Sequence, residues 1–364
     1  MKQNYNPLVS VITIVYNAAS TLERTIQSVL NQNYKNIEYI IIDGASTDGS
    51  LDIIERYKSH LSYFVSEKDS GIYEAMNKGV KKAKGEIIGI LNSDDWYNES
   101  AIKTAVEMFK DSSVEIAYGN ALMYYPNEPL RERRLFNAGI PLEAMWYCMA
   151  IAHPATFVRS SVYAKMGLFD ESFKIAGDYE FILRCYASGI KFKKTEEVLT
   201  NFTDGGYSIR NFVLCNQETI KINMDYIDSC PVPELVKEKN IKRLENEKYQ
   251  KLLYALNKGT ENLFLNLGLN IKEGLAIWGT GRWAMNIYNY CVSICCPVLF
   301  FIDNNKEKWD SVQGNVKVKS PEVLKQHSGT VLIAVKDYDT DIAEQIKMFN
   351  NPALKVLLLR DLIQ

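Results

Sequence analysis

Two adjacent carboxylates, Asp94 and Asp95, close an apolar stretch that runs from Ile87 to Leu91. Neighbouring like charges are costly unless a cation or hydrogen-bond donors neutralise them. Mg²⁺ and Mn²⁺ prefer oxygen ligands of this kind, so the pair is a candidate metal site. The same two residues also suit a plain polar turn in which they do no chemistry. Both interpretations stay open on this stretch alone.

A third acid, Asp43, closes a second apolar stretch, Ile37–Ile42. In open α/β sheets, ligands bind outside the carboxyl ends of the strands. A crevice lined by such strand ends is large enough for a nucleotide. The sequence therefore predicts that Asp43 and Asp95 face one nucleotide-sized site.

The elements that must position these acids alternate between strand and helix. Apolar, largely β-branched runs at 8–15, 37–42, 61–66 and 87–91 predict strands. Helices are expected at 20–30 behind a Ser20-x-x-Glu23 capping box, at 50–57, at 72–83 behind Asp69-Ser-Gly71, and from 101 behind Asn98. Alternation at this spacing indicates βαβ units and a mainly parallel sheet, hence an α/β fold.

Length and composition exclude several classes of protein. A chain of 364 residues predicts two or three domains. A net charge of −2 gives no basic field for nucleic acid, so no nucleic-acid partner is expected. The seven cysteines form no C-x-x-C pair, and those at 291, 295 and 296 predict buried thiols. With no apolar signal region and no stretch long enough to span a membrane, we expect a cytoplasmic protein.

Four consecutive stretches resemble the signatures of family 2 glycosyltransferases. They are Val-Ser-Val-Ile-Thr-Ile-Val-Tyr-Asn (9–17), Ile-Ile-Ile-Asp-Gly-Ala-Ser-Thr-Asp-Gly-Ser (40–50), Gly-Ile-Tyr-Glu-Ala-Met-Asn-Lys-Gly (71–79) and Leu-Asn-Ser-Asp-Asp (91–95). The resemblance covers residues 8–210 and is closest to bacterial members that build capsules, exopolysaccharides and O-antigens. It implies an inverting enzyme of the GT-A fold, a nucleotide-diphospho-sugar transferase with a Rossmann-like mixed sheet.

The resemblance also implies roles for individual residues on the donor side. Asp43 would bond the nucleobase, Asp94 would contact the ribose or assist the metal, and Asp95 would bind a divalent Mg²⁺ or Mn²⁺. The other implied donor contacts are Thr13, Val15 and Tyr16, which would wall the base, and Asn77, Lys78 and Ser93. Lys78 and Arg24 could reach phosphate, although an exposed helical position would explain each as well. Asp43-Gly44-Ala45-Ser46 departs from the commoner Asp-Asp-Gly-Ser, which leaves one carboxylate beside the base and its identity in doubt.

On the acceptor side, Asp178 stands in the first turn of a predicted helix, where helix capping alone would explain it. The resemblance implies more, because the family places its general base here, and an inverting transfer needs one carboxylate to deprotonate the acceptor. Glu180 is the nearest rival, and Arg184 is expected to pair with it at i+4. His153 is either a hydrogen-bonded turn residue or part of the acceptor side. Ser208, in a flexible loop after the core, would close over the diphosphate with help from Arg210.

The second half of the chain predicts two further parts. Residues 211–272 have helical periodicity and form an expected connector, so the GT-A domain is placed at 1–210 and a Rossmann-like domain at 273–364. The last part carries Gly279-Thr-Gly281-Arg-Trp-Ala284 between strand and helix, with Asp303 downstream. This pattern fits a dinucleotide fingerprint. A structural or oligomerising module is the alternative.

These observations predict a metal-dependent glycosyltransferase of bacterial surface polysaccharide synthesis. The expected partners are a nucleotide-sugar donor, with UDP preferred to GDP or dTDP, and a glycan or polyprenyl-linked acceptor with a free hydroxyl. Peripheral association with the inner face of the plasma membrane and a homo-oligomer are compatible with this prediction. Two alternatives stay open: a catalytically inactive nucleotide-sugar-binding scaffold, and an NAD-linked oxidoreductase acting through the C-terminal domain.

Overall fold

The computed structural model describes residues 5–126, 132–136, 139–258, 264, 272–335 and 338–362. The chain divides into two compact units, Met1–Ile241 and Lys242–Gln364, which are taken one at a time. Part of the predicted connector, residues 259–263 and 265–271, lies outside the described residues. The predicted division at residues 210 and 272 therefore remains a proposal.

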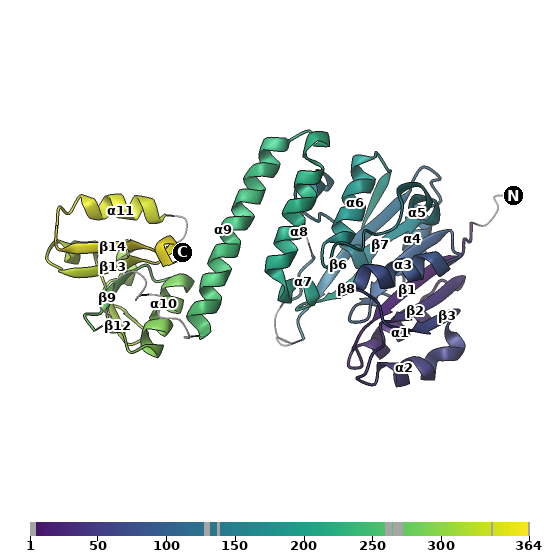
Figure 1. Cartoon of the computed structure of the whole chain (residues 1–364), viewed down its shortest axis with the longest axis horizontal. Coiled ribbons are helices and arrows are strands. Elements are labelled where there is room, and N and C mark those ends of the chain that lie inside the picture. Colours follow the sequence, from purple (N-terminus) through teal and green to yellow (C-terminus); the bar gives the residue numbers. More distant parts are fainter. Residues whose placement is uncertain are drawn as a thin grey trace. The chain divides into compact units, whose positions relative to one another are not determined.

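The first unit is built on one mixed sheet of eight strands in the order β3-β2-β1-β4-β7-β6-β8-β5 (Figure 1). The strands are β1 Val9–Val15, β2 Ile37–Asp43, β3 Tyr63–Ser66, β4 Ile87–Asn92, β5 Trp96–Tyr97, β6 Ile116–Tyr124, β7 Thr156–Arg159 and β8 Phe192–Thr203. The first four strands pair in parallel. The expectation of a mainly parallel sheet holds for this half, whereas β7 runs antiparallel to both its neighbours.

Helices cover both faces of this sheet. They are α1 Leu22–Leu30, α2 Ser50–Tyr57, α3 Ile72–Lys82, α4 Ala101–Met108, α5 Ser160–Met166, α6 Gly177–Ala187, α7 Tyr207–Arg210, α8 Phe212–Asp225 and α9 Pro233–Lys258, the last of which crosses the border between the units. Alternate residues of β1 enter two cores: Val9 and Val11 pack with α1, α2 and α4, and Ile12 and Ile14 pack with α3, α5 and α6. Burial on both faces explains why the central strands are almost wholly apolar.

The core of the first unit continues past residue 210. Ile222 of α8 and Val236 of α9 are fully buried in the same cluster as residues of α3 and α6. The side chains on these two helices therefore stabilise the sheet domain itself. The segment expected to be only a connector contributes to the core of the unit that holds the candidate site.

Two local predictions about helix ends are wrong. The N-cap of α1 is Thr21 and makes no side-chain capping bond, so Ser20 and Glu23 form no capping box. The N-cap of α4 is Ser100, because the side chain of Asn98 instead bonds to Val198 and Asn201 of β8. Glu23 instead accepts a hydrogen bond from the Tyr57 hydroxyl, so tertiary partners have taken Glu23 and Asn98 from the roles that the local pattern assigned to them.

The second unit contains a six-stranded sheet in the order β11-β12-β10-β9-β13-β14. Its elements are β9 Leu275–Trp278, α10 Arg282–Ser293, β10 Val298–Ile302, β11 Val312–Gln313, β12 Val316–Lys319, β13 Gly329–Ile333, α11 Asp339–Lys347 and β14 Leu354–Leu358. The central strands are parallel, as expected of a Rossmann-like unit. The short β11–β12 hairpin was not predicted.

Two further expectations can be compared with the structure. All seven cysteines are free thiols, but Cys295 is exposed and not buried as expected. Among the described residues, none of the helices is long and apolar enough to cross a membrane.

Candidate active site

Side-chain hydroxyls from α1 and β8 bond the backbone of the turn that carries the two acids at the end of β4. Thr25 donates from its hydroxyl to the carbonyl oxygens of Ser93 (3.0 Å) and Asp95 (2.6 Å), and Thr203 donates to the carbonyl of Asp94 (2.5 Å). Asp95 is only 1% exposed. Its Oδ1 accepts the Thr203 N–H at 2.9 Å, and its Oδ2 is buried with no hydrogen-bond partner in the described part of the chain.

The electrostatics of this turn are unfavourable for two ionised acids. Burial raises the pKa of Asp95 well above its usual range, and the neighbouring charge of Asp94 raises it further. Burial also raises the pKa of Asp94, although Arg24 and Arg210 oppose the shift. Arg24 is not an exposed helical arginine: it donates to the carbonyl of Asp94 at 2.9 Å, and its guanidinium lies 3.6 Å from the centroid of the Trp96 ring. Arg24 therefore lies against the acid turn.

This donor set fits a divalent cation that also binds a diphosphate. Within the described residues, no three His, Cys, Asp or Glu side chains gather closely enough to hold a metal by themselves. Mg²⁺, however, is commonly held by one or two carboxylates together with substrate phosphates. The unpaired Oδ2 of Asp95, beside the carboxylate of Asp94, is the buried oxygen that such an ion would satisfy.

Asp43 lies at the same edge of the sheet, because it pairs with Val15 at the end of β1, whose Ile14 pairs with Asn92 of β4. Asp43 is 0% exposed. Its carboxylate accepts three hydrogen bonds, from the Ser46 N–H (3.0 Å), the Ser46 hydroxyl (2.5 Å) and the Ser66 hydroxyl (2.6 Å). These bonds join the loop after β2 to the end of β3.

A different carboxylate, Asp69, lies where the missing acid of the loop would have been. A Cβ added to Gly44 would lie only 2.7 Å from Oδ2 of Asp69 and 3.3 Å from the ring of Tyr16. Tyr16 is 69% exposed, so its ring is open to a ligand. Asp69 accepts the Gly71 N–H at 3.2 Å, and burial raises its pKa. The sequence signal for Asp69 is the departure at Gly44, and only the fold shows which residue lies beside that glycine.

The other predicted donor contacts lie in varied surroundings. Thr13 and Val15 are buried in β1, and the Thr13 hydroxyl lies 3.1 Å from that of Tyr39. Lys78 pairs with Glu67 and Glu74 at 3.0 Å each, and Ser208 is exposed on α7.

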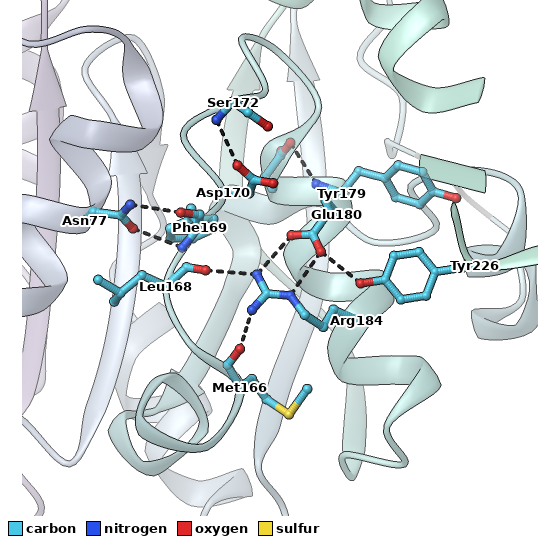
Figure 2. A network of polar contacts seen from close by, with 11 residues as sticks. Asn77, Met166, Leu168, Phe169, Asp170, Ser172, Tyr179, Glu180, Arg184 and Tyr226 are labelled. Carbon is cyan, nitrogen blue, oxygen red and sulfur yellow. Dashed lines mark hydrogen bonds and ion pairs between the residues drawn. The ribbon is translucent and has the colours of Figure 1, made fainter. Parts of the chain in front are cut away.

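Asn77 has no free amide N–H in this structure. Its side-chain nitrogen donates to the carbonyl of Phe169 (2.9 Å) and to Glu171 (2.8 Å), and its oxygen accepts the Phe169 N–H (3.0 Å). The left side of Figure 2 shows this pairing between α3 and the loop that follows α5.

Asp178 occupies the first turn of α6 and is half-buried. The Tyr73 hydroxyl at the start of α3 lies 2.5 Å from the carbonyl of Ile175 and 3.1 Å from Oδ1 of Asp178. His153 is close enough for the Asp178 charge to act on it: burial lowers the pKa of His153, and Asp178 opposes that shift. The ring of His153 meets Phe169 edge-on at 5.9 Å between centroids. The structure therefore brings Asp178, His153 and Tyr73 together.

Glu180, the rival base, is engaged in a network of its own (Figure 2). Arg184 donates to both of its oxygens, at 3.0 and 2.9 Å, which confirms the predicted i+4 pair. Arg184 also donates to the carbonyls of Met166 and Leu168, and the Tyr226 hydroxyl donates to Glu180 at 2.9 Å. These contacts join α6 to the loop after α5 and to the end of α8.

The predicted nucleotide fingerprint of the second unit has local explanations. Asp303 accepts hydrogen bonds from the Thr280 hydroxyl (2.5 Å), Lys308 (3.0 Å) and the Asn305 N–H (2.8 Å). Gly279 has φ +112°, and a Cβ there would lie 2.9 Å from Val335. Ala284 is buried in the core, and Gly281 precedes α10. A hollow of about 300 Å³ borders Gly279 and Asp303.

Comparison with known proteins gives one family for the first unit. Residues 10–172 match the family model described as glycosyl transferase family 2, and residues 271–357 match one described as C2185-like, N-terminal. An uncharacterized glycosyltransferase of Mycobacterium tuberculosis is 34% identical over 183 residues, which are 49% of this chain and 68% of that protein. A Bacillus subtilis glycosyltransferase named for teichuronic acid biosynthesis is 37% identical over 133 residues, which are 35% of this chain and 52% of that protein.

Among solved structures, a mannosyltransferase of Pyrobaculum calidifontis, in complex with GDP-mannose and Mn²⁺, has a similar fold. It superposes with a TM-score of 0.53 at 18% identity, over 80% of this chain and 86% of that one. At this identity the likeness concerns the fold alone.

Proposed function

Because this chain belongs to glycosyl transferase family 2 and is a glycosyltransferase of the GT-A fold, we propose that it is a metal-dependent, inverting enzyme. It moves a sugar from a nucleoside diphosphate to a hydroxyl of a glycan or polyprenyl-linked acceptor. The observation that carries the proposal is the buried, unpaired Oδ2 of Asp95 next to Asp94. A protein that used this turn only as structure would gain stability by replacing one of the two acids.

Asp94 and Asp95 would hold the cation, which neutralises negative charge on the diphosphate as it leaves. Arg210 lies near enough to Asp94 for its charge to lower the pKa of that carboxyl. A phosphate beside the acid pair would therefore meet a positive side chain as well. Arg24 takes no phosphate in this proposal, because its guanidinium faces Trp96 and the Asp94 carbonyl.

Asp178 acts as the general base. As the acceptor oxygen bonds to the anomeric carbon, its proton passes to the Asp178 carboxylate, and the bond from that carbon to the diphosphate oxygen breaks on the opposite face. Glu180 is less suited to this role, because Arg184 and Tyr226 occupy its oxygens.

On the donor side we propose that Asp69, and not Asp43 alone, bonds the nucleobase. Asp43 accepts three internal hydrogen bonds and has no exposed surface, whereas Oδ2 of Asp69 and the exposed ring of Tyr16 both lie next to Gly44. A carboxylate only accepts hydrogen bonds, so it selects a base with a ring N–H, such as uracil or guanine. Asn77 is left out of the donor site because its amide N–H groups are engaged.

The named relative supports a surface glycan as the product. The Bacillus subtilis relative is named for the synthesis of teichuronic acid, a cell-surface polymer. We propose the same broad class of acceptor here, with the enzyme working at the inner face of the plasma membrane. No cofactor is proposed for the second unit.

The test is release of nucleoside diphosphate from UDP-glucose, UDP-N-acetylglucosamine, UDP-galactose and GDP-mannose, with Mn²⁺ present and water as acceptor. Asp178→Asn should keep donor binding, and its turnover should fall about 10²- to 10⁴-fold, the factor that a general base supplies. Glu180→Gln is the matched control. If Glu180→Gln removes the turnover and Asp178→Asn keeps it, the base has been assigned to the wrong residue.

A further inference from the structure

Three consecutive backbone N–H groups before α6 converge on one distant carboxylate, Glu218 of α8. Lys174 donates to its Oε1 at 2.7 Å, and Ile175 and Ala176 donate to its Oε2 at 2.9 Å each. Glu218 lies more than forty residues further along the chain. One side chain therefore bonds every residue of the segment 174–176.

This segment leads directly into the turn that carries Asp178. Helix α6 begins at Gly177, and its N-cap, Ala176, has no side chain that could cap it. The first N–H groups of a helix have no partner inside the helix, and a carboxylate beside them is favourable. Glu218 supplies from another helix the anchor that the local sequence lacks.

The opposite side of the segment is held by the donor half of the site. The Tyr73 hydroxyl lies 2.5 Å from the carbonyl of Ile175, and the Lys174 amine donates to the carbonyl of Ser70 at 3.4 Å. The ring of Tyr73 also leaves no room beside Gly177, where an added Cβ would lie 2.8 Å from it. Segment 174–176 is thus fixed between α3 and α8, and Asp178 follows two residues later.

We infer that Glu218 is a positioning residue for the general base Asp178. The inference rests on the proposed function, because it takes Asp178 as the base. It also makes α8 part of the catalytic apparatus, although α8 lies beyond residues 10–172, which match the family model. A chain cut before Phe212 would keep the donor-side acids and lose the anchor of the base.

The informative variant is Glu218→Gln, which keeps the shape of the side chain. Its amide oxygen can still accept the two N–H groups that bond Oε2, but its amide nitrogen would face the Lys174 N–H as a second donor. The segment should loosen, and a misplacement of about 1 Å can cost about 10²-fold in rate. We expect kcat for nucleotide release to fall about tenfold or more, with the donor KM unchanged within about twofold.

The experiment uses the full chain with Mn²⁺ and the sugar nucleotide of the four-donor panel that the wild type turns over fastest. Asp225→Asn is the matched control, because Asp225 lies on the same helix and forms an exposed ion pair with Lys221. Glu218→Asp keeps the charge and should restore part of kcat. In an Asp178→Asn background, Glu218→Gln should cause no further loss, because it acts through the base.

Hydrogen exchange at amides 174–176 gives a readout that needs no turnover. Exchange there should be faster in Glu218→Gln than in wild type and Asp225→Asn. A Glu218→Gln protein with wild-type kcat and wild-type exchange would overturn the inference. So would a fall in kcat on adding Glu218→Gln to Asp178→Asn that equals its fall in the wild-type background. If the wild type binds and hydrolyses no donor at all, the proposed function fails, and the exchange result alone still decides whether Glu218 anchors the segment.

Discussion

Replacing Asp95 with asparagine should change stability and activity in opposite directions. In the metal-free protein, Asp95 is a buried acid beside a second acid, with one oxygen bonded to Thr203 and the other unpaired. Asparagine keeps the shape and the Thr203 bond but removes the charge. Burial and the charge of Asp94 disfavour the ionised form of Asp95. An uncompensated buried charge costs at least as much as an unpaired buried polar group, about 1–3 kcal/mol, so removing the charge should stabilise the metal-free variant by up to that amount.

For a unit of this size, such a gain corresponds to a rise in melting temperature of about 2 to 12 °C. The assay is thermal unfolding in EDTA and again with Mn²⁺ and UDP. The wild type should be stabilised by Mn²⁺ and UDP together, and Asp95→Asn should not. Nucleotide release by the variant should fall at least about 10²-fold, because the charge of the leaving diphosphate is no longer balanced. A variant that is less stable in EDTA and still responds to Mn²⁺ would refute this reasoning.

Three further predictions concern the donor site, the acceptor side and the α6 network. Asp69→Asn should weaken the binding of UDP or GDP about tenfold to a hundredfold, measured by calorimetry with Mn²⁺. Gly44→Ala should also weaken this binding, because its Cβ would displace the Asp69 carboxylate. Burial lowers the pKa of His153 in the folded protein. As the pH falls below about 6.5, the unfolded chain therefore binds a proton at this residue before the folded chain does, and the folded state loses stability. The melting temperature should drop more between pH 7 and 5 for the wild type than for His153→Gln. Arg184→Lys should cost about 1–3 kcal/mol in urea unfolding, because the single ammonium of lysine cannot reproduce the four hydrogen bonds that Arg184 makes to Glu180 and two carbonyls. Arg56→Lys, at an exposed pair, should change stability by about 0.5 kcal/mol or less.

Each of these predictions has an outcome that contradicts it. If Gly44→Ala weakens UDP binding by the same factor in the wild type and in a variant that lacks the Asp69 side chain, then Asp69 is not the group that the new Cβ displaces. A pH dependence of melting that is the same in His153→Gln would assign it to other groups. Equal losses in Arg184→Lys and Arg56→Lys would mean that the bonds to the two carbonyls contribute little.

The sheet could be predicted because its central strands are buried on both faces. Val9–Val15, Ile37–Asp43 and Ile87–Asn92 form mainly apolar runs whose ends agree with the predicted ranges to within a residue or two. These runs alone therefore predict that the acids at their ends lie at one edge of the sheet.

Polar contacts at the ends of elements could not be predicted, since their partners come from distant loops. The entry to α1 is held by the loop after β2, whose Asp48 and Ser50 accept the N–H groups of Ala19 and Ala18. A local pattern at Ser20 and Glu23 carries no information about that loop. The same limit applies to Asp43, whose bond from Ser66 depends on the pairing of β2 with β3.

On both the donor side and the acceptor side of the site, some residues could be predicted from the sequence and others depend on tertiary contacts. Gly44 was recognised as a departure, but only the fold shows that Asp69 fills the space beside it. Asp178 was predicted from its surroundings in the sequence, and Tyr73 lies in one of the recognised stretches, whereas Glu218, which holds the segment before Asp178, lies in none of them. Residues that touch a ligand tend to lie in recognisable stretches, and residues that position them depend on tertiary contacts.

The most direct test of the central claim is nucleotide release from the four-donor panel by the full chain, measured with Mn²⁺ and with EDTA. We predict turnover of at least one donor by the wild type with Mn²⁺, no turnover in EDTA, and a rate at least about 10²-fold lower in Asp95→Asn with Mn²⁺. Equal turnover in Mn²⁺ and EDTA, or normal turnover by Asp95→Asn, would contradict a cation held by the acids at the end of β4.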